Sequence, residues 1–237
     1  MIEAYHRPET LEQALALLES RDAAVLGGGT SLIAGGGATA VVDLQDLGLD
    51  TIALDGERIG IGAMTRLVDL ASSDLVPHPL RELARREAPN TIRNAATVGG
   101  TIATGDPESE LLAGLLVYEA DVEVTTLNDE ATMNLGEYLD ARPEGIITSI
   151  SIAASGMANA ARTGRTPADR PIVMAVARRS PDGTVLLAMT GVGAAPQLVD
   201  PSAVHELTPP ADFRGSTEYR RHLATLLGAR AVAGLHA

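Results

Sequence analysis

A run of three glycines at 27–29 follows the apolar stretch 23–26 and leads directly into Thr30 and Ser31. Glycine admits positive φ and lets backbone N–H groups approach a ligand with no Cβ in the way. Successive N–H groups in such a turn form a concave anion site, to which neighbouring hydroxyls add donors. A glycine cluster between apolar segments is most often a plain turn, so this loop alone leaves both interpretations open.

A second stretch, 96–107, repeats the pattern about seventy residues later, with Thr97, Gly99, Gly100 and Thr101 in sequence. Pro107 stands where a following helix could begin. That helix would add the positive end of its macrodipole to the loop. Two loops with hydroxyls in matching places favour a phosphate or pyrophosphate site over two unrelated turns.

Hydrophobic periodicity predicts an α+β chain throughout. Apolar residues recur at helical spacing in several segments, namely 11–20, 67–70, 80–84, 111–116 and a last helix from about 217. Strand patterns occupy 23–26, 40–44, 58–63, 121–127 and 145–152, and 172–176 with 185–192 form a predicted β-hairpin. The polar, proline-containing segment 198–213 is a predicted connector. A domain boundary is expected near 143–148.

Composition excludes several function classes. The chain has 31 acidic and 18 basic residues, a formal charge of −13, and all 18 basic residues are arginine. A nucleic-acid binder needs a cationic surface, so DNA and RNA are not expected partners. Without lysine there is no Walker-type phosphate loop. Without cysteine there is no disulfide, thiolate metal site or iron–sulfur ligation, so any such centre belongs to another chain.

Other motifs are also missing. The first loop has Leu32 where the dinucleotide fingerprint needs its third glycine, which disfavours a Rossmann dehydrogenase. No serine lies in a Gly-x-Ser-x-Gly elbow, and the histidines show no metal-ligand spacing. There is no signal-peptide pattern and no apolar run of transmembrane length, so no membrane span is expected and a cytoplasmic location is the default expectation.

With both loops placed, the sequence resembles the FAD-binding (medium) subunit of the molybdenum hydroxylases, a family that includes the flavin subunits of carbon monoxide dehydrogenase and xanthine dehydrogenase. The matching segments occur in the family's order and cover most of the chain: 5–8, 28–33, 42–44, 59–65, 92–94, 97–100, 105–107, 214–216, 218–220 and 230–231.

The resemblance implies an α+β fold with a two-lobed FAD-binding domain of the PCMH type over 1–145, its lobes being roughly 1–50 and 51–145. A small, shortened α+β C-terminal domain over 146–237 would follow. It also implies the residues that contact FAD: Leu26, Gly27, Gly28, Gly29, Thr30, Ser31, Leu32, Thr97, Gly100, Thr101, Thr104, Asp106, Glu110, Ile147 and Arg165, with Arg162 as the alternative to Arg165.

Each of these assignments has a structural alternative. Asp106 could simply cap the following helix, and Glu110 could be a solvated acid in its first turn. Arg162, Arg165 and Asp169 could form an exposed ion-pair cluster in a loop.

The resemblance implies a function in electron transfer, with no catalytic residue in this chain. Reducing equivalents would come from a 2Fe–2S small subunit beside a molybdopterin-containing large subunit, and FAD would pass them to an external acceptor. Thr101 replaces the family's usual asparagine, Glu110 replaces an aspartate, and the connector 198–213 lacks a helix that most members carry. These departures motivate one alternative, a flavin-free scaffold or assembly subunit. Another is a stand-alone NAD(P)H-dependent flavoprotein reductase.

Overall fold

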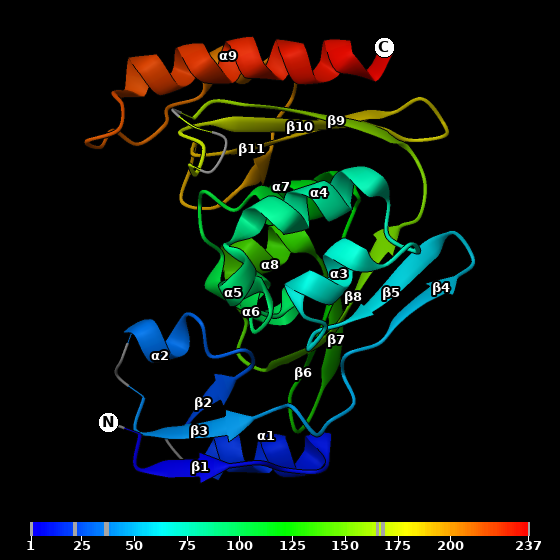
Figure 1. The fold of residues 1–237 in the computed structure, drawn as a ribbon, viewed down its shortest axis with the longest axis vertical. Coiled ribbons are helices and arrows are strands. Elements are labelled where there is room, and N and C mark those ends of the chain that lie inside the picture. The colour runs from blue at the N-terminus through cyan, green and yellow to red at the C-terminus, as the bar shows by residue number, and fades with distance from the viewer. Residues whose placement is uncertain (1, 21–22, 36–37, 165, 167–168, 237) are drawn as a thin grey trace.

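A computed structural model describes residues 2–20, 23–35, 38–164, 166 and 169–236. The chain forms three units stacked along the long axis of the molecule, each with its own sheet (Figure 1). The N-terminal lobe lies at one end, a larger helix-rich lobe in the middle, and the C-terminal domain at the other end, capped by α9 (Thr217–Ala233). The predicted α+β class is confirmed.

The first lobe is a three-stranded parallel sheet in the order β1-β3-β2. Its central strand pairs on both edges, and all four of its residues are buried. Helix α1 begins where predicted, and the Thr10 hydroxyl accepts a hydrogen bond from the Gln13 N–H. The elements are β1 (Ala4–His6), α1 (Leu11–Ser20), β2 (Ala23–Leu26), α2 (Leu32–Gly35) and β3 (Ala40–Asp43).

The second lobe is a five-stranded antiparallel sheet, in the order β4-β5-β8-β6-β7, covered by helices. Its elements are β4 (Ile52–Asp55), β5 (Arg58–Gly62), α3 (Leu67–Ser72), α4 (His78–Glu87), α5 (Asn90–Arg93), α6 (Val98–Thr104), α7 (Glu110–Val117), β6 (Asp121–Thr125), β7 (Glu130–Asn134), α8 (Leu135–Ala141) and β8 (Ile146–Ala153).

The central position of β8 bears on the predicted domain division at 145/146. This strand pairs with β5 on one side and β6 on the other, so it belongs to the sheet of the second lobe. A strand that pairs with distant partners cannot be assigned to a domain by its sequence position alone. We therefore propose that the division falls after Ala153, with the lobes otherwise as predicted.

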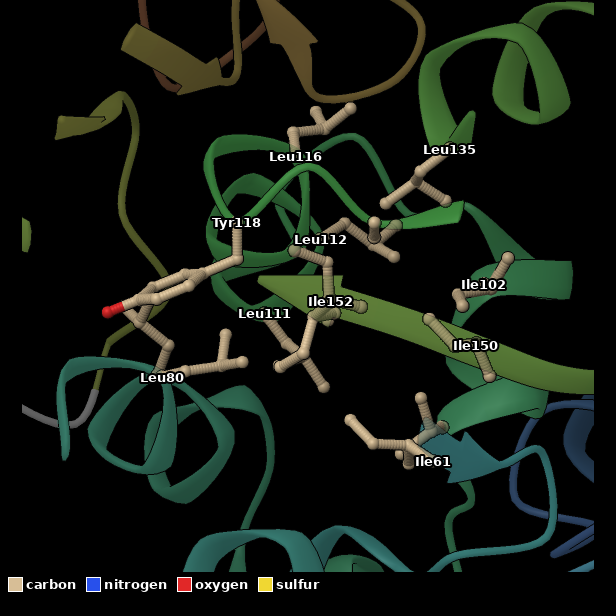
Figure 2. Close-up of a cluster of buried hydrophobic side chains, with 14 of the residues drawn as sticks. Ile61, Leu80, Ile102, Leu111, Leu112, Leu116, Tyr118, Leu135, Ile150 and Ile152 are labelled. Atoms are coloured by element: carbon tan, nitrogen blue, oxygen red, sulfur yellow. The ribbon is translucent and has the colours of Figure 1, made fainter. Parts of the chain in front are cut away.

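The main core lies between this sheet and helix α7. All eight residues of α7 are buried, because α4 packs on one side and strands β10 and β11 on another. Figure 2 shows Leu111 and Leu112 of α7 beside Ile150 and Ile152 of β8, with Leu80 of α4 nearby. Helix α7 is thus shared between the second lobe and the C-terminal domain.

The C-terminal domain is a four-stranded antiparallel sheet in the order β12-β11-β10-β9, with α9 on its outer face and α7 on its inner face. The predicted hairpin is confirmed as β10 and β11. The elements are β9 (Met157–Arg162), β10 (Met174–Arg179), β11 (Val185–Thr190), β12 (Gln197–Leu198), the 3₁₀ helix η1 (Val204–Glu206), α9, and the 3₁₀ helix η2 (Gly234–His236). Within the described residues, no helix is both long and apolar enough to cross a membrane.

Candidate functional site

The glycine loop after β2 lies directly against the segment that precedes α6. A Cβ on Gly28 would lie 1.8 Å from the carbonyl oxygen of Ala95, and one on Gly27 would lie 3.0 Å from Oγ1 of Thr97. Gly29 has a φ of +71°, which favours glycine. The glycines therefore allow the two lobes to approach closely, and Gly29 also provides the positive φ of the turn.

The N–H groups of this loop are available for a ligand. Among the hydrogen bonds of the described residues, none is donated by the backbone N–H groups of residues 27–32, whereas the next N–H, that of Ile33, donates to the Gly29 carbonyl. Six consecutive N–H groups without a protein acceptor need water or an anion to satisfy them. The arrangement suits the pyrophosphate of a dinucleotide cofactor, which accepts several hydrogen bonds and carries negative charge.

A cleft of about 480 Å³ opens at this loop, within the usual size of cofactor sites. It lies between the lobes, with residues 27–32 on one wall and the second stretch on the other. The cleft brings together eleven of the residues expected to contact FAD: Gly27, Gly28, Gly29, Thr30, Ser31, Leu32, Thr97, Gly100, Thr101, Thr104 and Asp106.

The second glycine stretch differs from the prediction, because it is a helix and not an anion-binding loop. Thr97 caps α6, and its Oγ1 accepts from the Gly100 N–H at 3.1 Å. The N–H groups of Val98 and Gly99 donate to the carbonyls of Thr65 and Ala63. A Cβ on Gly99 would lie 2.8 Å from that of Ala63, so Gly99 permits close packing. The first-turn N–H groups of α6 are thus already satisfied by protein.

The predicted helix start at Pro107 is also displaced. Helix α7 begins at Glu110, and the hydroxyl of Ser109 caps it by accepting from the Leu112 N–H at 3.1 Å. Asp106 therefore does not cap this helix. Its Oδ1 accepts from the Glu108 N–H at 2.9 Å, and its other oxygen pairs with Arg170.

Side-chain hydroxyls join the two walls of the cleft. The Thr104 hydroxyl lies 3.3 Å from the Ser31 hydroxyl, and it also donates to the Gly100 carbonyl at 2.8 Å. The Thr101 hydroxyl donates to the Thr97 carbonyl at 3.0 Å. The Thr101 and Thr104 hydroxyls donate to carbonyls of their own segment, which makes the backbone of residues 27–32 the main source of free donors.

Three predicted residues are buried and do not line the cleft. Leu26 and Ile147 are buried in hydrophobic packing. Glu110 is also buried, and it pairs with Arg162 at 2.9 Å. The structural alternative for Glu110 is wrong, because this carboxylate is buried and not solvated. Arg165 lies outside the described residues.

Sequence reasoning missed two charged residues of the cleft, Glu87 and Arg170. Arg170 follows a loop of the C-terminal domain and reaches Asp106 across the domain junction. Glu87 ends α4, is buried, and accepts a hydrogen bond from the Leu111 N–H at 2.9 Å. Burial raises the pKa of Glu87, although the hydrogen bonds from Leu111 and Ser109 act in the opposite direction. No sequence pattern marks either residue, since both contacts are long-range.

The raised pKa of Glu87 predicts a pH-dependent effect on stability. The folded chain holds this proton more tightly than the unfolded chain, so Glu87 favours folding at low pH and loses that contribution as pH rises through its folded pKa. Glu87→Gln cannot ionise. We compare the melting temperature of Glu87→Gln with that of wild type, both in the FAD-free state. We expect the variant to gain stability relative to wild type at pH 8 compared with pH 4.5. An equal difference at both pH values would contradict this.

The fold and the cleft define a class of protein: a two-lobed domain with a cofactor-sized cleft beside a glycine loop. Residues 1–154 match the family described as the FAD binding domain in molybdopterin dehydrogenase. The chain belongs to this family, which confirms the resemblance and the expected cofactor, FAD. It is an FAD-binding subunit of a molybdenum-hydroxylase-type oxidoreductase.

Relatives agree with this assignment. The chain is 30% identical over 256 residues to the uncharacterized protein YgfM of Escherichia coli K12, covering 100% of this chain and 96% of that protein. It is 37% identical over 132 residues to the carbon monoxide dehydrogenase medium chain of Afipia carboxidovorans, covering 51% and 46% of the two chains. The xanthine dehydrogenase FAD-binding subunit of Escherichia coli O157:H7 is 31% identical over 134 residues, covering 51% and 45%.

Solved structures extend the likeness to the whole chain. A chain of the Cu,Mo-CO dehydrogenase in its cyanide-inactivated form superposes with a TM-score of 0.86 at 27% identity, covering 98% of both chains. A chain of reconstituted CO dehydrogenase from Oligotropha carboxidovorans gives the same TM-score and identity over 97% of this chain and 96% of that one. The shared fold therefore includes the C-terminal domain, which lies beyond the residues matched by the family.

Proposed function

We propose that this chain holds FAD in the cleft between its lobes and passes electrons from the iron–sulfur clusters of a partner subunit to an external acceptor. The observation that carries the proposal is the run of six N–H groups, in residues 27–32, that have no acceptor in the described protein and line a cofactor-sized cleft. The chain supplies binding and positioning. Bound FAD supplies the redox chemistry, because it accepts and releases electrons.

The composition supports a division of labour among subunits. The chain has no cysteine, and its described residues contain no group of three or more His, Asp or Glu that could hold a metal ion. These absences agree with iron–sulfur and molybdenum centres in other chains, and the relatives are named as medium chains or FAD subunits of dehydrogenases. We propose a complex with a molybdopterin-containing large subunit and a 2Fe–2S small subunit, located in the cytoplasm.

Within the site, we propose that residues 27–32 hold the pyrophosphate through their N–H groups. Thr97, Gly100, Thr101, Thr104 and Asp106 would form the facing wall of the cofactor site. Leu26, Ile147 and Glu110 would support these walls from behind, with Arg162 or Arg165 as the basic residue of the C-terminal domain. Holding the cofactor largely on backbone groups agrees with a net charge of −13, since few cationic side chains are needed.

The direct test is the visible absorption spectrum of the purified chain before and after FAD addition and desalting. A retained flavin spectrum, with FAD and not FMN released on denaturation, is the expected result. A protein that stays colourless both alone and when co-expressed with its neighbouring subunits would overturn the proposal. It would favour the flavin-free scaffold.

Stopped-flow reduction separates the stand-alone reductase from an electron-transfer subunit. The FAD-loaded chain is mixed with NADH without partner subunits, and flavin absorbance is followed. We expect the flavin to stay oxidised with NADH and to be reduced once the partner subunits and their substrate are present. Rapid reduction by NADH alone would support the reductase alternative.

A further inference from the structure

Three carboxylates alternate along the short segment that joins α6 to α7, and each is paired with an arginine of the C-terminal domain. Asp106 pairs with Arg170, Glu108 with Arg214, and Glu110 with Arg162. The arginines come from three separate places, namely the end of β9, the approach to β10 and the approach to α9. The three pairs together are called the ionic clasp below.

The arginines of the ionic clasp are themselves tied together. Arg214 donates to the Arg170 carbonyl at 2.6 Å as well as to Glu108. Arg162 likewise donates to the carbonyl of Asp169 as well as to Glu110. Two arginines thus hold the backbone at residues 169–170, which sets the position from which the Arg170 side chain reaches Asp106.

One pair of the ionic clasp lines the FAD cleft. Asp106 and Arg170 line that cleft, and Arg170 also lines a second cavity of about 500 Å³ together with Glu108 and Arg214. Arg170, which pairs with Asp106, therefore lines both cavities. Any motion of the C-terminal domain away from the second lobe must break these pairs.

We propose that the ionic clasp positions the C-terminal domain over the FAD cleft, so that FAD leaves only when the outer pairs open. This rests on FAD binding in the cleft, as proposed above. The Arg162–Glu110 pair is mostly buried, with side chains 19% and 4% exposed, whereas Arg170 is 47% exposed. Salt screens exposed pairs far more than buried ones. The salt sensitivity of FAD release therefore comes from the two outer pairs. It comes chiefly from Arg170–Asp106, whose side chains are 47% and 29% exposed, and to a smaller extent from Arg214–Glu108, whose side chains are 22% and 21% exposed.

The test is the rate of FAD release from the loaded full-length chain, followed by flavin fluorescence after dilution, at about 0.1 M and about 1 M salt. For wild type we expect faster release at high salt. Glu108→Gln removes one charge without changing the shape of the side chain. We expect roughly two- to fivefold faster release at low salt, with a weaker salt dependence. Asp46→Asn, which breaks the exposed Arg7–Asp46 pair in the first lobe, is the matched control and is expected to release FAD at the wild-type rate.

A second variant separates positioning from charge. Arg214→Lys keeps the charge, but its single ammonium does not reproduce the planar fork that serves both Glu108 and the Arg170 carbonyl. We expect an intermediate release rate, with an unchanged melting temperature of the FAD-free chain. If both variants release FAD at the wild-type rate and keep the wild-type salt dependence, the ionic clasp has no such role. A wild-type chain that binds no FAD would overturn the proposed function and this inference with it.

Discussion

Gly28→Ala is expected to weaken FAD binding roughly 100-fold, the loss that corresponds to two charge-assisted hydrogen bonds of about 1.5 kcal/mol each. The added Cβ would lie 1.8 Å from the Ala95 carbonyl oxygen and 2.5 Å from its carbon. Backbone atoms cannot yield as a flexible side chain can, so the loop must move away from the second lobe. That movement turns the N–H groups of residues 27–32 out of register with the phosphates.

Equilibrium titration with FAD, followed by flavin fluorescence, measures this effect. Gly60→Ala is the matched control: Gly60 lies in β5 away from the cleft, and its nearest neighbour to a new Cβ is the Ala53 carbonyl oxygen at 3.9 Å. We expect Gly60→Ala to bind FAD within about twofold of wild type, since a contact of that length is ordinary packing. Wild-type affinity in Gly28→Ala would show that the loop does not hold the cofactor.

The local part of the fold could be predicted from the sequence, because periodicity and caps are local signals. Helix α1, strand β2 and the β10–β11 hairpin fall where the patterns place them. The glycine loop was recognisable because an apolar strand, three glycines and two hydroxyls are adjacent in the chain. Its close contact with the second lobe could not be recognised, because Ala95 lies far from Gly28 in the sequence.

Two differences between the sequence prediction and the structure have one physical cause. Gly99 and Gly100 resemble an anion loop in sequence, but Gly99 is required by close packing against Ala63, and the N–H groups of the turn are bound within the protein. Strand β8 follows a predicted boundary, but its pairing partners lie in the second lobe. In both cases a tertiary contact decides the role of the segment, and a single sequence does not contain that contact.

The same limit applies to the charged residues of the cleft. Glu87 and Arg170 belong to different domains and have no common motif, yet both line the site. The acids at 106, 108 and 110 were visible in the sequence, and two of them entered the predicted site. Arg162 was also a sequence candidate, but its pairing with Glu110 and the pairings of Arg170 and Arg214 appear only once the C-terminal domain is placed against α7.

The junction between the second lobe and the C-terminal domain also depends on a buried cation. Arg178 of β10 is 1% exposed and its guanidinium stacks over the ring of Tyr118 at 5.1 Å. It donates to the Val117 carbonyl at 3.0 Å and to the Ser155 carbonyl at 2.8 and 2.9 Å. Burial raises the pKa of Tyr118 to about 12, so this phenol stays neutral beside the cation at physiological pH.

We expect Arg178→Met to destabilise the chain by about 3 kcal/mol, measured by urea unfolding. Methionine keeps an apolar stem against Tyr118 but leaves the Val117 and Ser155 carbonyls without their donor. Glu119→Gln is the control, since the Glu119 side chain is 53% exposed and its ion pair with Arg178 should contribute less than about 1 kcal/mol. Arg178→Lys should lie between the two, because one ammonium does not reproduce the fork that reaches both carbonyls. If Arg178→Met unfolds at the wild-type urea concentration, the two carbonyls do not depend on Arg178, and packing of α7 against β10 alone holds the domains together.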